Sequence, residues 1–179
     1  MSGKTTNVAV GASLWVPSSI NDLYKVVLNV RGFPSWAPRV QRVEVLEGHQ
    51  EPGMVSEWEV SFLGLKRTFR SVLEEAEPPT LLRWSYEDLI SGWGGCEIRE
   101  RGEGALAVFE TQLWAQEPLL AKLVGNVGVR EVATSHLKRC LSRLGRMVVS
   151  EDDAERVRVG PVEVARRDEP STRMSEVAT

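Results

Sequence analysis

The chain has 179 residues, 42% of them hydrophobic, which is enough to bury the core of one domain. Its formal net charge is −3, and residues 1–149 carry acidic and basic residues in equal number, which argues against bulk attraction to nucleic acid. No signal-peptide pattern opens the chain and no window approaches about 18 uninterrupted apolar residues, so we expect a cytoplasmic protein without integral membrane association.

The first predicted elements are one strand and two short helices. Apolar residues alternate over 8–16, the period of a half-buried strand, whereas residues 1–6 are predicted to be flexible. After a serine N-cap, apolar residues recur at helical spacing from Ile20 to Asn29. The two prolines of the Arg31–Pro38 segment then permit only a short helical turn or a loop.

From about Arg39 to Trp114 the dominant period is two, which is typical of strands with one buried face. Glycine turns, such as those at Gly64 and at Gly102–Gly104, separate the segments. Because the connections are short, neighbouring strands should run antiparallel. Together with the N-terminal strand, these segments predict a curved antiparallel sheet of six to seven strands.

One long amphipathic helix is predicted after the sheet, over roughly Glu117 to Val149. A sheet followed by one such helix buries both apolar faces best by curling around it, and this arrangement encloses a pocket. Gly125 and Gly128 stand inside the helix, where each costs about 1 kcal/mol relative to alanine. They make room either for a close-packed strand or for a ligand. The predicted fold class is α+β, with one domain over residues 7–149.

Residues 150–179 form a charged tail without aromatic residues or a sustained period. Such a segment cannot bury enough apolar surface to offset its ordering entropy, so we expect it to be largely disordered. Val157–Val159 or Val162–Val164 could add a short strand to an open sheet edge.

Motifs for metal, cofactor or nucleophilic chemistry are absent from the sequence. Cys96 and Cys140 have no metal-ligand spacing and are expected to be small buried hydrophobes in a reducing compartment. His49 lies in a turn and is expected to be solvated. No phosphate-binding glycine loop or serine elbow is present, so we expect no metal and no cofactor.

The order of these elements resembles the START-like (SRPBCC) superfamily, in its polyketide cyclase/dehydrase and coenzyme Q-binding branch. The resemblance covers about residues 7–149, and its most specific part is the Phe-Pro-x-Trp-x-Pro segment at Phe33–Pro38. It implies a helix-grip fold, in which the sheet grips the C-terminal helix around an apolar cavity. Such cavities hold a lipid, an isoprenoid, an aromatic polyketide or another hydrophobic molecule.

Aromatic residues on apolar strand faces are the candidate ligand contacts, because large rigid rings bind planar or isoprenoid molecules at little entropic cost. The same rings could equally serve core packing in a single-layer sheet. Trp36 is a candidate gate residue at the cavity mouth. The predicted contacts are Trp36, Trp58, Phe69, Trp84, Trp93, Trp114, Gly125 and Gly128.

Four polar residues are weak candidates for catalysis, namely Arg67, Tyr86, Glu110 and His136. Arg67 shares a strand face with Phe69, so it either enters the cavity with Glu110 as its partner or lies on a solvated edge. The resemblance implies that cyclases use a cavity arginine to steer ring closure, but no arginine here matches that position. His136 has either a structural or an acid/base role.

Two functions of different class follow. The first is binding of a hydrophobic small molecule, and the alternative is a polyketide cyclase/dehydratase (aromatase) acting in the same cavity. A weaker alternative is a protein-interaction module, favoured slightly by the basic residues of the final helix. A homodimer is compatible with the sequence.

Overall fold

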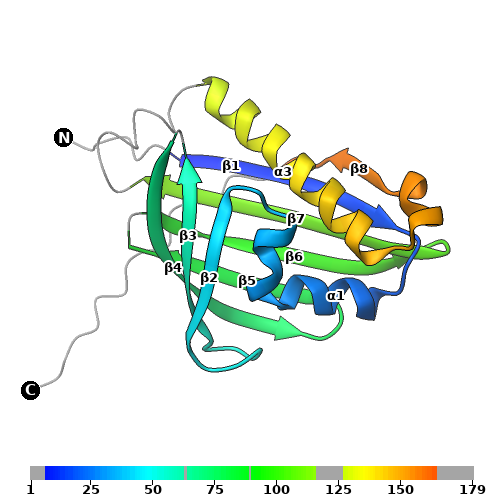
Figure 1. Cartoon of the computed structure of the whole chain (residues 1–179), viewed down its shortest axis with the longest axis horizontal. Helices are drawn as coiled ribbons and strands as arrows, with labels where there is room; N and C mark the ends of the chain where they lie inside the picture. The colour runs from blue at the N-terminus through cyan, green and yellow to red at the C-terminus, as the bar shows by residue number, and fades with distance from the viewer. Residues whose placement is uncertain (1–6, 63, 89, 116–126, 165–179) are drawn as a thin grey trace, which may run out of the picture.

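The computed structural model describes residues 7–62, 64–88, 90–115 and 127–164, and in it one curved antiparallel sheet wraps around a long C-terminal helix (Figure 1). The sheet has eight strands in the spatial order β2-β3-β4-β5-β6-β7-β1-β8. The strands are β1 (Asn7–Val16), β2 (Val40–Glu47), β3 (Val55–Phe62), β4 (Leu65–Glu77), β5 (Leu81–Glu87), β6 (Ile90–Arg101), β7 (Gly104–Ala115) and β8 (Arg158–Pro161). The helices are α1 (Ile20–Leu28) and α3 (Val127–Val148), with two 3₁₀ helices, η1 (Val30–Ser35) and η2 (Glu151–Arg156). The predicted α+β helix-grip fold is confirmed.

Helix α1 begins at the N-cap Ser19, whose Oγ accepts a hydrogen bond from the backbone N–H of Asp22 at 3.1 Å. Its residues Leu23, Tyr24 and Val27 are buried in the core. Since α1 contacts β6, β7 and α3, it closes one side of the concave face of the sheet (Figure 1).

The core lies between the concave face and α3. Ala12, Phe109, Cys96 and Leu82 lie opposite one another across β1, β7, β6 and β5, and all four are buried. Against this row α3 packs a stripe that includes Leu141 and Leu144, both 0% exposed. Strand alternation therefore sets which residues can reach any internal cavity.

Helix α3 is described from Val127 and ends at Val148, close to the predicted end. Its predicted start at Glu117, together with Gly125, lies outside the described residues.

The beginning of the predicted disordered tail is ordered instead. Strand β8 pairs antiparallel with β1, with Val159 opposite Leu14, and Val157 and Val159 pack against the core cluster. The physical reason is that β1 would otherwise leave an unpaired strand edge. This strand raises the count above the predicted six to seven. Residues 165–179 lie outside the described residues.

Candidate functional site

A cavity of about 490 Å³ lies between the concave face of the sheet, the segment that follows α1, and α3. Its lining comes from strands β1 to β7, from α1 and η1, and from α3, and is mainly apolar. This volume lies within the roughly 300–1,000 Å³ range of small-molecule sites. The space between the sheet and α3 is therefore large enough for a small molecule.

One wall of the cavity is a continuous row of aromatic rings. The Phe33 ring centroid lies 4.2 Å from that of Trp36 and 4.7 Å from that of Trp58, the latter edge-on at 86°. Trp58 stacks on Phe69 at 6.1 Å and 10°, and Phe69 meets Tyr86 edge-on at 5.6 Å. Each ring therefore packs against at least one neighbour in the row, in geometries that favour aromatic pairs.

Four of the predicted ligand contacts, Trp36, Trp58, Phe69 and Trp84, line this cavity. Trp36 is only 3% exposed, and its Nε1 finds no acceptor among the described residues. The cavity position of Trp58, Phe69 and Trp84 agrees with their predicted strand parity, and that of Trp36 agrees with its predicted loop position. Contact with a ligand stays a prediction.

Trp93 and Trp114 do not line the cavity. Trp93 of β6 lies opposite Gln112 of β7. Along β7, Gln112 and Trp114 alternate with Thr111 and Leu113, which line the cavity. Successive strand residues point to opposite faces, so the side chains of Trp93 and Trp114 belong to the convex face. Sharing a strand face with apolar neighbours does not show which face is concave.

Neither glycine of the predicted helix is placed on the cavity. Gly128 is exposed in the first turn of α3, apart from the cavity-lining residues of the described chain. Gly125 lies outside the described residues.

A hydrogen-bonded chain crosses the cavity wall at Tyr86. Nε1 of Trp84 donates to Oη of Tyr86 at 2.6 Å, and Oγ1 of Thr111 lies 3.3 Å from the same oxygen and 3.1 Å from the carbonyl oxygen of Trp93. Thr111 has a single hydroxyl proton. The Thr111 hydroxyl therefore serves one of these two acceptors at a time, and Oη of Tyr86 accepts from Trp84 in either case. Burial raises the pKa of the Tyr86 hydroxyl, although both hydrogen bonds lower it in part.

Arg67 lines the cavity from β4, so its strand face is the inner one. Its Nη1 donates to the backbone carbonyl of Lys66 at 3.0 Å. The expected Arg67–Glu110 ion pair does not form: Glu110 sits on β7, three strands away, opposite Gly11 and Gly95. Glu110 borders the cavity, but its side chain has the parity of the convex face.

His136 lies on α3 and lines the cavity beside Cys140, with 3.5 Å between Nε2 and Sγ. Burial lowers the pKa of His136, and the positive charges of Arg39 and Arg139 lower it further. The imidazole is therefore neutral near pH 7. Burial also raises the pKa of the Cys140 thiol, so this neighbour is neutral as well.

Sequence reasoning did not single out several lining residues, among them Phe33, Arg39 and Thr111. Phe33 and Arg39 belong to the segment around Trp36. The prolines of this segment can be recognised in the sequence, but its contacts with the sheet cannot. Thr111 shares the parity of Phe109 and Leu113, and that alternation could have identified it.

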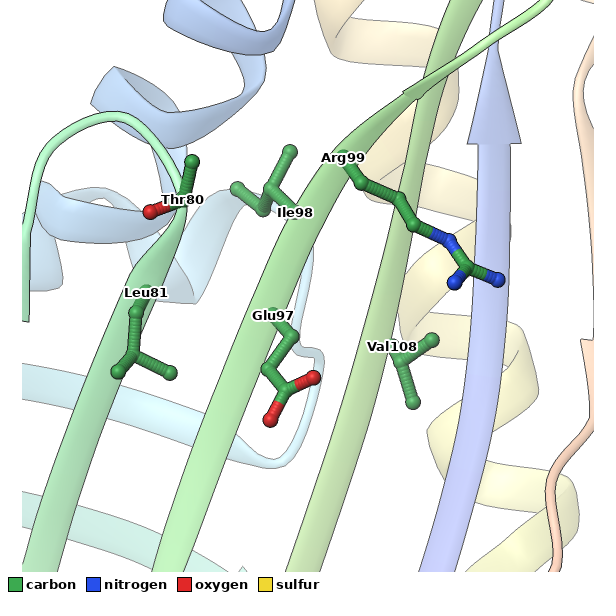
Figure 2. A pocket seen from close by; sticks show the side chains of 6 residues that line it. All are labelled: Thr80, Leu81, Glu97, Ile98, Arg99 and Val108. Carbon is green, nitrogen blue, oxygen red and sulfur yellow. The ribbon is translucent and has the colours of Figure 1, made fainter.

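A second hollow, of about 310 Å³, lies on the convex face (Figure 2). Leu81, Glu97 and Val108 lie opposite one another across β5, β6 and β7, out of phase with the inward-facing Leu82 and Phe109. Its lining in the described chain has no aromatic side chain. We therefore place the candidate site in the inner cavity.

Neither a metal-ligand cluster nor a membrane-spanning helix is present among the described residues. No group of three His, Cys, Asp or Glu side chains there could hold a metal ion. Within the same ranges, no helix is both long and apolar enough to cross a membrane.

The fold recurs in solved structures. A START superfamily protein from Mycobacterium smegmatis has a TM-score of 0.66 at 15% identity, covering 78% of this chain and 96% of its own. The Zhui aromatase/cyclase from Streptomyces sp. R1128 has a TM-score of 0.65 at 16% identity, covering 80% and 97%. A protein from Thermus thermophilus has a TM-score of 0.62 at 22% identity, covering 76% and 96%. At these identities the likeness establishes the fold.

The sequence adds family membership to the fold. No curated protein matches the chain significantly. A family model described as "Polyketide cyclase / dehydrase and lipid transport" matches residues 16–136, from the end of β1 into α3. The chain therefore belongs to the polyketide cyclase/dehydrase and lipid transport family of the START-like superfamily.

Proposed function

We propose that the protein binds a hydrophobic small molecule, such as a lipid, an isoprenoid or an aromatic polyketide-like compound, between the sheet and α3. The observation that carries this proposal is the cavity of about 490 Å³ with its preformed aromatic wall. A flat or unbranched apolar molecule that lies along that wall would move out of water and into contact with the aromatic rings. Burial of apolar surface is worth about 25 cal/mol per Å² before the costs of binding are subtracted.

A space-filling variant tests this proposal directly. Ala133 lines the cavity from α3, so Ala133→Phe should occupy the chamber with its own ring. Ser135 lies on the same helix with an exposed side chain, and Ser135→Phe adds an equal ring outside the cavity as the matched control. We expect N-phenyl-1-naphthylamine, a neutral apolar dye, to fluoresce with the wild type and the control and to lose binding in Ala133→Phe. Native mass spectrometry of the purified protein would identify a retained natural ligand.

The proposal fails if the dye does not bind the wild type, or if Ala133→Phe binds it as well as Ser135→Phe does. Circular dichroism of both variants separates loss of binding from loss of fold.

A second candidate function is cyclisation and dehydration of a polyketide-like chain, favoured by the presence of Arg67 and Tyr86 in one apolar cavity. In an aldol closure a base removes an α-proton to form an enolate, the enolate carbon bonds to a ketone carbon as the ketone π bond opens, and the resulting alkoxide takes up a proton. The new hydroxyl then leaves with a second α-proton as water. A guanidinium can stabilise the enolate oxygen from which the step begins. Product analysis with poly-β-ketone substrates tests this function. An unchanged product distribution with Arg67→Ala would remove Arg67 from the mechanism.

A further inference from the structure

Among the described residues, three tryptophans line the cavity, and two of them have an acceptor for the indole N–H. Nε1 of Trp58 donates to Oγ of Ser56 at 2.9 Å, and Nε1 of Trp84 donates to Oη of Tyr86 at 2.6 Å. Nε1 of Trp36 is buried, and it has no hydrogen-bond partner in the part of the chain that the structure describes. Trp36 is therefore the exception on the cavity wall.

The unpaired indole N–H of Trp36 is unfavourable in a way that a ligand can relieve. Buried polar groups in native proteins almost always have a partner, and a buried donor without one loses its contact with water and gains nothing in return. The other such atom among the described residues, Oη of Tyr24, belongs to a residue outside the cavity lining. For Trp36, by contrast, the cavity offers a place for the missing acceptor.

Trp36 stands at one end of the aromatic wall. Its ring centroid lies 4.2 Å from that of Phe33, and the row continues from Phe33 through Trp58 and Phe69 to Tyr86. The backbone of Trp36 is held by a hydrogen bond, because its N–H donates to the carbonyl oxygen of Phe33 at 3.0 Å. A molecule that lies along the row would therefore bring one of its ends to the Trp36 ring.

We propose that the ligand of this cavity carries a neutral oxygen acceptor, such as a ketone carbonyl, which accepts a hydrogen bond from Nε1 of Trp36 while the apolar body lies along the aromatic wall. This inference rests on the proposed binding function and narrows it from any hydrophobic molecule to oxygenated ones. One neutral donor balances the desolvation of one neutral oxygen. A hydrocarbon would leave the N–H unpaired, so Trp36 is a residue that determines specificity.

Two ligands of one shape separate this inference from the proposal on which it rests. They are 2-acetylnaphthalene, which has a carbonyl oxygen, and 2-isopropenylnaphthalene, in which a methylene group replaces that oxygen. Displacement of N-phenyl-1-naphthylamine measures both affinities. We expect Trp36→Phe, which keeps an aromatic ring without the N–H, to weaken the ketone by about threefold to tenfold more than the alkene. The matched control is Trp58→Phe, which makes the same change where the N–H is already bonded to Ser56 and should weaken both ligands equally.

NMR of the wild type provides a second measurement that does not depend on the folding of a variant. The indole proton of Trp36 is one of six in the chain, and its signal is assigned through its own backbone resonances. A hydrogen bond deshields the donated proton, so the ketone should move this signal further downfield than the alkene does.

The outcomes distinguish the two proposals. If neither naphthalene displaces the dye and the dye itself does not bind, the proposed binding function fails. If both ligands bind but Trp36→Phe weakens them equally, and the indole proton of Trp36 responds alike to both, the oxygen site is overturned and the binding function stands.

Discussion

Nε1 of Trp84 donates a 2.6 Å hydrogen bond to Oη of Tyr86, two residues further along the same strand and on the same cavity wall. The contact fixes two rings at once, because Tyr86 also bonds Thr111 and meets the edge of Phe69. A polar pair inside an apolar chamber is strongly held only while both partners are present.

Removing the Tyr86 hydroxyl should destabilise the fold more than removing both partners. Tyr86→Phe leaves the indole N–H of Trp84 and the hydroxyl of Thr111 short of a partner, at a cost of about 1–3 kcal/mol in the free energy of unfolding. The double variant Tyr86→Phe/Trp84→Phe removes the unpaired indole donor and should recover part of that loss beyond the additive expectation. Urea unfolding of the single and double variants measures the coupling. Strictly additive losses would contradict the predicted chain.

Alkaline titration should show less than half of the tyrosine ionised at the pH where free tyrosine is half ionised, about 10. The chain has two tyrosines, and burial raises the pKa of both Tyr24 and Tyr86. Because the folded state holds these protons more tightly than the unfolded state, stability is fully present below pH about 10 and is lost as the pH rises beyond it. Ultraviolet absorbance should therefore show tyrosinate at a higher pH in the folded protein than in the urea-unfolded chain. Ionisation of one tyrosine in the native protein near pH 10 would contradict this.

Strand parity predicts several of the aromatic residues that line the cavity. Trp58, Phe69 and Trp84 were placed on apolar faces by alternation alone, and each lines the cavity. The same rule failed for Trp93 and Trp114, because alternation identifies two faces without saying which becomes concave.

Two charged residues show what the sequence could not supply. Whether Arg67 and Glu110 can pair depends on the order of strands in the sheet, and two strands, β5 and β6, lie between the two residues. Arg39 escaped attention because it precedes β2 and a register shift follows it between Val40 and Arg42. Long-range pairing and irregular registers depend on the assembled sheet, whereas alternation is local.

His136 should be more than half neutral at the pH where a free imidazole is half charged, about 6.5. Its pKa is lowered first by burial and then by Arg39 and Arg139, so Arg39→Gln should raise it. Because the unfolded chain binds this proton more readily, the contribution of His136 to stability is present above pH about 6.5 and is lost as the pH falls through the lower folded pKa. An NMR pH titration measures the shift, and His136→Gln assigns the resonance because His49 is the only other histidine. An unchanged pKa in Arg39→Gln would show that Arg39 does not act on the imidazole.

Gly145 of α3 should tolerate no side chain while β8 is in place. A Cβ at this position would lie 2.5 Å from Cγ1 of Val157 and 3.0 Å from Cδ1 of Leu14, closer than carbon atoms approach. Gly145→Ala should therefore destabilise the protein by about 1–3 kcal/mol, even though alanine favours a helix by about 1 kcal/mol. Val157→Ala removes the main obstacle, so the double variant should be more stable than the sum of the single effects predicts. Thermal unfolding of the three variants measures the coupling. If the two substitutions prove additive, the segment before β8 does not pack on α3 as the structure places it.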